Sequence, residues 1–271
     1  MIQLEPPPTR YDLYFHLLGF QVRIHPWFWV VAVLLGIGPE DKELGLAVLV
    51  IWVLALFVSL LIHELGHAWV MRQLGQDARV LLYGFGGLAI PRPGRAFSSR
   101  WRLRPPWDQV VVSLAGPGAM LLLLVLIWLL LRLAGTPLRF ELGGPLGIYW
   151  QFEGIENQRL SILLHYLVMI NLFWALFNLL PVYPLDGGQV LLKLLVHGLG
   201  NPGLLLVFRI SMMVALVAAA LLLWRLGFRD GLFPALILGL LAFQNHRLEQ
   251  QLRGGGEWSR HEEDDDQWWR G

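Results

Sequence analysis

The sequence predicts an all-α polytopic membrane protein, with about six transmembrane helices and a short membrane-associated β-hairpin or re-entrant loop. The first observation is composition: 56% of the 271 residues are hydrophobic and 15% are charged, against about 45–50% and about 25% in soluble domains. The second is distribution, because the apolar residues fall in runs that reach the roughly 20 residues a bilayer-crossing helix needs. A helical protein embedded in lipid accounts for both.

The chain is expected to have three regions: a membrane-surface segment over 1–24, a membrane domain over 25–250, and a disordered acidic tail over 251–271. In the first region, YFHLLGFQVRIH has the short apolar and aromatic stretches of a strand or hairpin. The residues before it hold acids and prolines but no long apolar core, so they do not resemble a cleaved signal peptide.

Six apolar runs are expected to span the membrane: 25–38, 44–71, 107–134, 160–181, 203–226 and 231–246. Between the second and third runs, RVLLYGFGGLAIP is apolar but too short and too rich in glycine for a spanning helix. Backbone without helical hydrogen bonds cannot face lipid, so this stretch is expected to form a hairpin or re-entrant loop against protein. After the fourth run, VYPLDGGQV is expected to open a short helix that reaches about His197.

Arginine placement predicts the orientation. The stretch between Met71 and Pro105 carries Arg72, Arg79, Arg92, Arg95, Arg100, Arg102 and Arg104. By the positive-inside rule, this stretch is expected to face the cytoplasm. The protein itself is expected in the cytoplasmic membrane. Six spans then put both termini in the cytoplasm, and the motifs HELGH and PLDGG come out near the same, cytoplasmic face.

The second apolar run contains the motif HELGH, and its ionisable residues are His63, Glu64 and His67. Ionisable groups inside a bilayer are costly unless they are paired, so they indicate a function. On a helix, His63 and His67 are about 40° apart around the axis and roughly 6 Å apart along it. This is the HExxH arrangement, with two zinc-binding imidazoles and a glutamate base. A purely structural role would leave three polar groups in hydrocarbon without a reason.

A catalytic zinc site needs a third protein ligand and an open position for water. The chain has no cysteine, so the ligands must be nitrogen or oxygen atoms. The candidates at membrane depth are His165, Asp186, His197 and His246. Asp186 is preferred because NLLPVYPLDGG returns it to the depth of His67. The alternative for Asp186 is a helix N-cap before a glycine turn, and His165 is expected to make an interhelical contact.

Four motifs in this order resemble the site-2 protease family of intramembrane zinc metalloproteases: HELGH in a membrane helix, then GFGG, SLAGP and NLLPVYPLDGG. The resemblance implies that His63, His67 and Asp186 bind one zinc ion per chain and that Glu64 activates water. It also implies that Asn178 steadies the substrate carbonyl or the oxyanion. The loop of Gly84, Phe85, Gly86 and Gly87 matches the one thought to hold substrate in an extended form.

One position departs from the family. The third span of the family often has AGPxxN, whereas AGPGAM places Met120 at the asparagine position. That asparagine is expected to be structural, so the catalytic assignment is retained. The extramembrane segments are too short for a PDZ-like or a CBS domain.

The expected function is therefore that of an intramembrane zinc metalloprotease, which hydrolyses peptide bonds within or near transmembrane segments in regulated intramembrane proteolysis. The expected partners are single-span membrane proteins and the lipid bilayer. The net charge of +1 gives no reason to expect nucleic acid. The oligomeric state is open.

Two alternatives remain at this point. A secondary transporter or metal permease would bind an ion at broken helices, but it gives Glu64 no role. A catalytically inactive relative would bind membrane proteins without cutting them, which the intact HELGH motif disfavours. Asn171, seven residues before Asn178, is interpreted as an interhelical hydrogen-bonding group rather than a catalytic one.

Overall fold

A computed structural model of the chain describes residues 5–37, 45–84, 86–96, 105–136, 138–141, 149–152 and 154–253. The predicted acidic tail therefore lies almost entirely outside the described residues. The chain divides into two compact units, Met1–Leu179 and Leu180–Gly271. Each unit is described separately.

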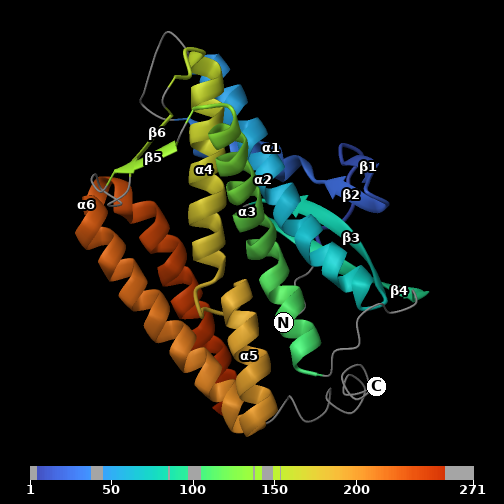
Figure 1. The fold of residues 1–271 in the computed structure, drawn as a ribbon. Helices are drawn as coiled ribbons and strands as arrows, with labels where there is room; N and C mark the ends of the chain where they lie inside the picture. Colours follow the sequence, from blue (N-terminus) through green and yellow to red (C-terminus); the bar gives the residue numbers. More distant parts are fainter. Residues whose placement is uncertain are drawn as a thin grey trace. The chain divides into compact units, whose positions relative to one another are not determined.

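The first unit contains three long helices that lie side by side (Figure 1). These are α2 (Gly45–Gln73), α3 (Trp107–Leu133) and α4 (Gln158–Asn178). Small residues bring α2 and α3 close together: a Cβ on Gly66 would lie 2.5 Å from the carbonyl oxygen of Ala115 and 2.8 Å from Ala119 Cβ. Such close approach is typical of helices packed in a membrane.

A four-stranded sheet completes this unit, with strands β1 (Leu13–Leu17), β2 (Phe20–Ile24), β3 (Gln76–Tyr83) and β4 (Gly86–Ala96). The order is β1-β2-β3-β4, and β2 runs parallel to β3 while the other pairs are antiparallel. The hairpin predicted from RVLLYGFGGLAIP is thus the β3–β4 pair. The fold is mostly helical, and the expected β structure is larger than a hairpin, because the N-terminal segment and the β3–β4 hairpin pair their backbone groups in one sheet.

A second, two-stranded antiparallel sheet pairs β5 (Leu138–Glu141) with β6 (Tyr149–Phe152). This stretch lies between the third and fourth predicted runs, where no element was predicted. Its strands are four residues each, which is too short for a clear alternation of apolar and polar residues.

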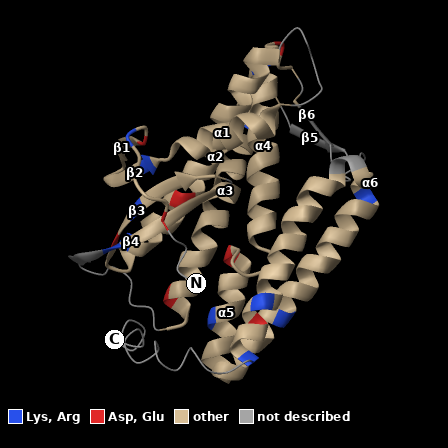
Figure 2. Ribbon diagram, turned by 180° about the vertical axis from the view of Figure 1, so that it is seen from behind, with Lys and Arg blue, Asp and Glu red and all other residues tan. Residues whose placement is uncertain are grey.

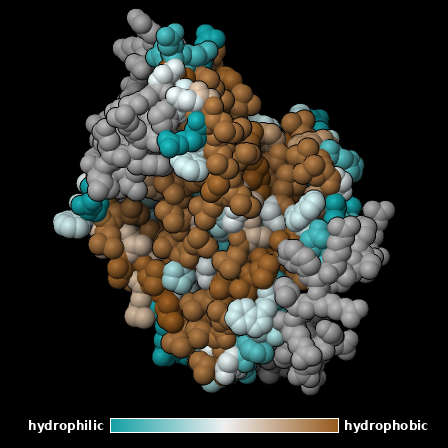
Figure 3. All heavy atoms as spheres, in the orientation of Figure 1, coloured by the Kyte–Doolittle hydropathy of each residue, from teal (hydrophilic) through white to brown (hydrophobic). Residues whose placement is uncertain are grey.

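The core of the first unit lies between the sheet and α2. Phe20, Val22 and Ile24 on β2 are buried together with Phe28 and Leu60 on the helices. The outward faces of the long helices are apolar instead of polar, as Leu122 and Leu133 show with exposures of 70% and 84%. Figure 3 shows hydrophobic side chains over the visible helical surface, and Figure 2 shows few charged residues along these helices. Apolar outer faces of this kind are suited to lipid.

In the second unit, α5 (Asp186–Leu199) packs on α6 (Asn201–Arg253). The backbone of α6 leaves the helical conformation at Gly227, where φ is 74° and ψ is 176°. Glycine is suited to a positive φ because it has no Cβ. The break separates two limbs that match the fifth and sixth predicted runs, and Arg209 on the first limb donates to Glu249 on the second over 2.6 Å.

Four described helices are long and apolar enough to cross a membrane: Gly45–Gln73, Trp107–Leu133, Gln158–Asn178 and Asn201–Phe228. The chain is thus a multi-pass membrane protein, but the count of six is not confirmed. The first predicted run forms only α1 (Pro26–Gly36), whose 11 residues extend about 16 Å, roughly half of a bilayer core. It begins directly after His25, whose backbone N–H donates to the carbonyl of Leu82 on β3.

Candidate metal centre

The HELGH residues lie in the 29-residue helix α2. His63, Glu64 and His67 are 4%, 5% and 7% exposed. Burial of three ionisable side chains in an apolar helix is unfavourable unless polar partners or an ion satisfy them. The partners on α3 and the sheet are therefore part of the site.

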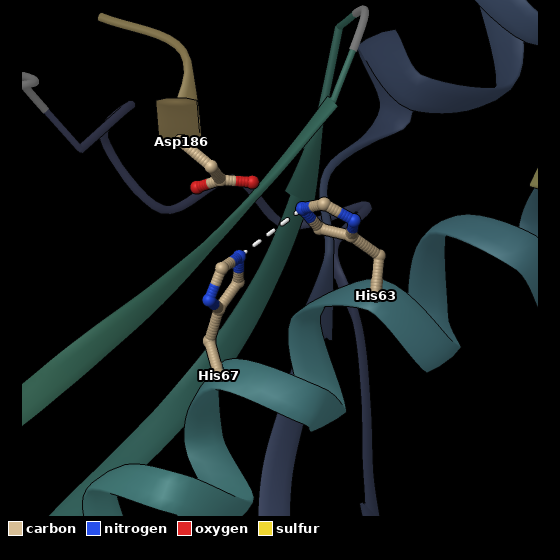
Figure 4. Close-up of side chains that lie close together, drawn as sticks. All are labelled: His63, His67 and Asp186. Atoms are coloured by element: carbon tan, nitrogen blue, oxygen red, sulfur yellow. Dashed lines mark hydrogen bonds between the residues drawn. The ribbon is translucent and has the colours of Figure 1, made fainter. Parts of the chain in front are cut away.

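The two imidazoles turn the same nitrogen toward each other. His63 Nε2 and His67 Nε2 are 3.1 Å apart, and the ring planes are at 79° to one another (Figure 4). This follows from the helical period, which places residues i and i+4 on one face. Two facing ring nitrogens at this distance are suited to share an ion.

The outer nitrogens of both rings contact α3. His67 Nδ1 lies 2.7 Å from the carbonyl oxygen of Val112, and His63 Nδ1 lies 3.3 Å from the Sδ of Met120. A carbonyl oxygen accepts and cannot donate, so the proton of His67 is on Nδ1 and the lone pair is on Nε2. That is the arrangement in which a zinc-binding histidine donates its second N–H to an outer acceptor.

Gly116 of α3 leaves the space in front of the imidazoles open. A Cβ there would lie 2.7 Å from His63 Nε2 and closer still to His67 Nε2. A side chain of any kind would thus occupy the position next to both ligand atoms. The glycine of SLAGP has a direct steric role at the site, in addition to helix packing.

Glu64 lies against the end strand of the sheet. A Cβ on Gly87 of β4 would lie 2.7 Å from Glu64 Oε1 and would overlap its Cγ. The backbone of β4 therefore passes directly beside the carboxylate. Gly84 has a φ of 54° and opens the β3–β4 turn, while Phe85 of the predicted substrate loop lies outside the described residues.

The two asparagines of α4 have different surroundings. Asn171 is fully buried, and its Nδ2 donates to Ser59 Oγ on α2 and to the Leu167 carbonyl, both over 2.8 Å. This confirms the interhelical interpretation of Asn171. Asn178 is the last residue of α4, and its Nδ2 donates to the Trp174 carbonyl over 2.9 Å.

Asp186 belongs to the second unit, where it is the first residue of α5. The N-cap of that helix is Leu185, so the alternative that Asp186 itself is the cap is corrected. A carboxylate in the first turn is favoured by the helix dipole. Gly188 permits the tight turn before the helix, because a Cβ there would lie 2.5 Å from the Val182 carbonyl oxygen.

Two residues of α6 hold the loop in front of Asp186. The Tyr183 backbone N–H donates to Ser211 Oγ over 2.9 Å, and Asn245 Nδ2 donates to the Tyr183 carbonyl over 2.6 Å. Ser211 and Asn245 are both fully buried. They are 28 and 62 residues away from Tyr183 in the sequence. Their hydrogen bonds fix the backbone at Tyr183, three residues before Asp186.

The described residues contain a group of side chains that could hold a metal ion, namely His63, His67 and Asp186 (Figure 4). Two imidazoles and one carboxylate form a ligand set that zinc uses in catalytic sites, with a fourth position left for water. The tautomer of His67 fits this use, because its Nε2 carries the lone pair. The donor chemistry thus agrees with zinc.

Sequence reasoning missed five residues that shape the site: Val112, Gly116, Met120, Ser211 and Asn245. SLAGP was one of the motifs of the family resemblance, and Met120 was expected to be at a structural position, but neither indicated a contact with the imidazoles. A backbone carbonyl such as that of Val112 leaves no trace in a residue pattern. Ser211 and Asn245 lie in apolar runs, where a buried polar residue is a signal of an interhelical partner.

The family model described as Peptidase family M50 matches residues 51–222. This range includes HELGH, SLAGP and NLLPVYPLDGG. It therefore includes most of α2 and all of α3, α4 and α5, with His63, His67 and Asp186.

Two curated proteins illustrate the similarity. The Synechocystis protein sll0528 is 32% identical over 199 residues, which cover 71% of this chain and 45% of that protein. The zinc metalloprotease MJ0392 of Methanocaldococcus jannaschii is 29% identical over 187 residues, which cover 67% of this chain and 44% of that protein. The matched parts span less than half of the length of either relative.

A solved structure has a similar fold. The site-2 protease from Methanocaldococcus jannaschii aligns with a TM-score of 0.50 at 21% sequence identity, and the alignment covers 88% of this chain and 95% of that one. At this identity the likeness describes the fold of the chain.

Proposed function

The chain belongs to peptidase family M50, and on that premise we propose that it is an intramembrane zinc metalloprotease of the HExxH type. Its substrates are peptide bonds within or near transmembrane segments of membrane proteins, in regulated intramembrane proteolysis. The observation that carries the proposal is the facing pair of buried imidazole nitrogens, 3.1 Å apart in a lipid-length helix. A pair of ionisable side chains in such an apolar helix indicates a function at membrane depth.

His63, His67 and Asp186 would hold the zinc ion, one per chain. Zinc, when bound, polarises the scissile carbonyl and makes water acidic enough to lose a proton near neutral pH. Glu64 takes the proton of the attacking water and later passes it to the leaving amine. The Val112 carbonyl would orient the imidazole of His67 through its Nδ1.

Asn178 would donate a hydrogen bond to the oxygen of the scissile carbonyl, where negative charge develops. Its amide Nδ2 donates one hydrogen to the Trp174 carbonyl within the same helix, and the amide group has a second hydrogen for the substrate oxygen. The position supports the role, because Asn178 ends α4 eight residues before Asp186.

Substrate would bind as an added strand. A transmembrane helix hides its carbonyl groups in hydrogen bonds, so the bond to be cut must lie in an unwound stretch. β4 is the end strand of the described sheet, and Gly87 on it lies beside Glu64. An extended peptide paired with β4 through the segment of Gly84, Phe85, Gly86 and Gly87 would run past the general base.

The proposed topology has six spans in the cytoplasmic membrane, both termini in the cytoplasm, and the zinc site near the cytoplasmic face. The proposed domain limits are 1–24, 25–250 and 251–271. The orientation is supported by arginines that follow the HELGH motif in the chain, namely Arg72, Arg79 and Arg92. The proposed partners are single-span membrane proteins.

Residues 1–24 would lie on the membrane surface. Tyr11, Leu13 and Leu18 of the β1–β2 hairpin are 65%, 53% and 67% exposed, which favours contact with the headgroup region. The hairpin is attached to the end of a span-length helix: Arg72 donates to the carbonyls of Leu18 and Gly19 over 3.1 Å and 2.9 Å. A hairpin fixed at that position is at interfacial depth.

The proposal is tested by Glu64→Gln, which keeps the size of the side chain but removes the base. New peptide ends inside transmembrane segments should appear in membranes that contain the wild type and disappear with the variant, while zinc content is unchanged. Glu156→Gln, at an exposed position before α4, is the matched control and should behave as the wild type. Equal cleavage by Glu64→Gln would refute the proposal, and zinc flux into proteoliposomes would indicate a permease instead.

A further inference from the structure

We propose that Met120 is a positioning residue of the metal centre, whose thioether accepts the Nδ1–H of His63 and holds Nε2 of that ring toward His67. The inference rests on the proposed function, because it assumes that the imidazoles bind zinc. It assigns a role in ligand orientation to a residue whose sequence position indicated only packing.

The geometry around Met120 supports this role. Its side chain is fully buried, and its Sδ lies 3.3 Å from His63 Nδ1, within the range of a hydrogen bond to sulfur. A thioether has no hydrogen to donate, so the contact is favourable only when Nδ1 carries the proton. The lone pair of His63 is then on Nε2, the atom that faces His67.

The two imidazoles are held unequally as a result. His67 donates to the Val112 carbonyl over 2.7 Å, whereas His63 donates to a weak sulfur acceptor over 3.3 Å. Carboxylates, carbonyls and water are the common outer partners of a zinc-binding histidine, and they increase its basicity. His63 therefore depends on a partner that orients the ring but adds little to its basicity.

Methionine in an apolar core usually serves packing alone, and Met120 does contact the apolar cluster between α2 and the sheet. The two roles make different predictions for substitution. Leucine fills nearly the same volume but cannot accept a hydrogen bond, whereas glutamine has the same chain length and a stronger acceptor. If packing alone mattered, leucine would be the better replacement.

The experiment measures zinc release from the purified, zinc-loaded full chain after addition of excess chelator. Removal of an outer partner typically weakens metal binding by about 10–100-fold, and a thioether is a weak partner, so Met120→Leu should lose zinc about 10-fold faster. Met120→Gln should lose it at or below the wild-type rate. Met169→Leu on α4 makes the same change at a partly buried core position and should leave the rate unchanged.

A spectroscopic measurement separates orientation from stability. With cobalt in place of zinc, the visible absorption bands should shift in Met120→Leu but stay unchanged in Met169→Leu. Equal release rates for wild type and Met120→Leu would overturn the inference, as would a release rate for Met120→Gln as fast as for Met120→Leu. A wild type that holds no zinc would instead refute the proposed function, and the inference with it.

Discussion

The two candidate parts of the metal centre are built in different ways. The imidazole pair of the first unit follows from the period of one helix, since residues 63 and 67 lie on one face of α2. The carboxylate of the second unit depends on a loop that Ser211 and Asn245 hold from distant positions in α6. Local geometry therefore prescribes two candidate ligands, whereas long-range side-chain contacts hold the loop before the third candidate.

This difference predicts how each part fails. A substitution beside the imidazoles directly reduces the space that the ion needs, because the helix itself cannot rearrange. A substitution in the second unit changes the position of Asp186 only through the backbone of its loop, and that loop can relax in part. Effects on zinc binding should thus be larger in the first unit.

The largest effect is expected for Gly116→Ala. The added methyl group would overlap the ligand nitrogen of His67 and lie 2.7 Å from that of His63, so zinc binding and cleavage should be lost. Metal analysis of the purified protein measures this directly. Gly118→Ala on the same helix is the control, since a Cβ there meets no atom of the described chain within 4 Å. Full zinc occupancy in Gly116→Ala would show that the ion does not bind beside α3.

Gly188→Ala should have the next largest effect. Its Cβ would overlap the backbone of residues 182 and 183, and such overpacking costs about 1–3 kcal/mol. We expect the loop before Asp186 to move and zinc to dissociate about 10-fold faster, without complete loss. Gly198→Ala near the end of α5 is the matched control, with open space around its Cβ among the described residues. Equal release from both variants would contradict a role for the loop.

Gly87→Ala should separate base positioning from zinc binding. The new methyl group would displace the Glu64 carboxylate, which can turn away because it ends a flexible side chain. The turnover rate should fall about 10-fold or more while zinc content stays at one per chain. Gly45→Ala at the start of α2 is the control, with no described atom within 4 Å of its Cβ. A loss of zinc in Gly87→Ala would show that β4 supports the ligands rather than the base.

The smallest effect is expected for Asn245→Ala. It removes the donor to the Tyr183 carbonyl and leaves a buried acceptor without that partner, which costs about 1–3 kcal/mol. The thermal midpoint of the zinc-loaded protein should fall by a few degrees. Gln250→Ala, at an exposed position further along the same helix limb, should leave the midpoint in place.

The features that could be predicted from the sequence are those that depend on short-range patterns of residues. Apolar runs of about 20 residues gave the long helices, and the spacing of four residues gave the imidazole pair. The run with glycines gave the β3–β4 hairpin. All of these signals lie within about 30 residues of chain.

What the sequence could not predict depends on contacts between distant segments. The parallel pairing of β2 with β3 joins Val22 to Val80, and no local pattern selects that partner. Next to this pairing, the His25 backbone N–H donates to the Leu82 carbonyl of β3 immediately before α1 begins. The contact of His67 with the Val112 carbonyl joins residues that are 45 positions apart. Val112 contributes only its backbone to this contact. One sequence contains no record of such contacts.

The central claim is that His63, His67 and Asp186 together hold zinc, and the zinc content of purified wild type and Asp186→Ala tests it most directly. We predict about one zinc per chain in the wild type and nearly none in the variant after dialysis against a weak chelator, because three protein ligands are needed for a stable catalytic site. Equal zinc content in the two proteins would contradict the claim.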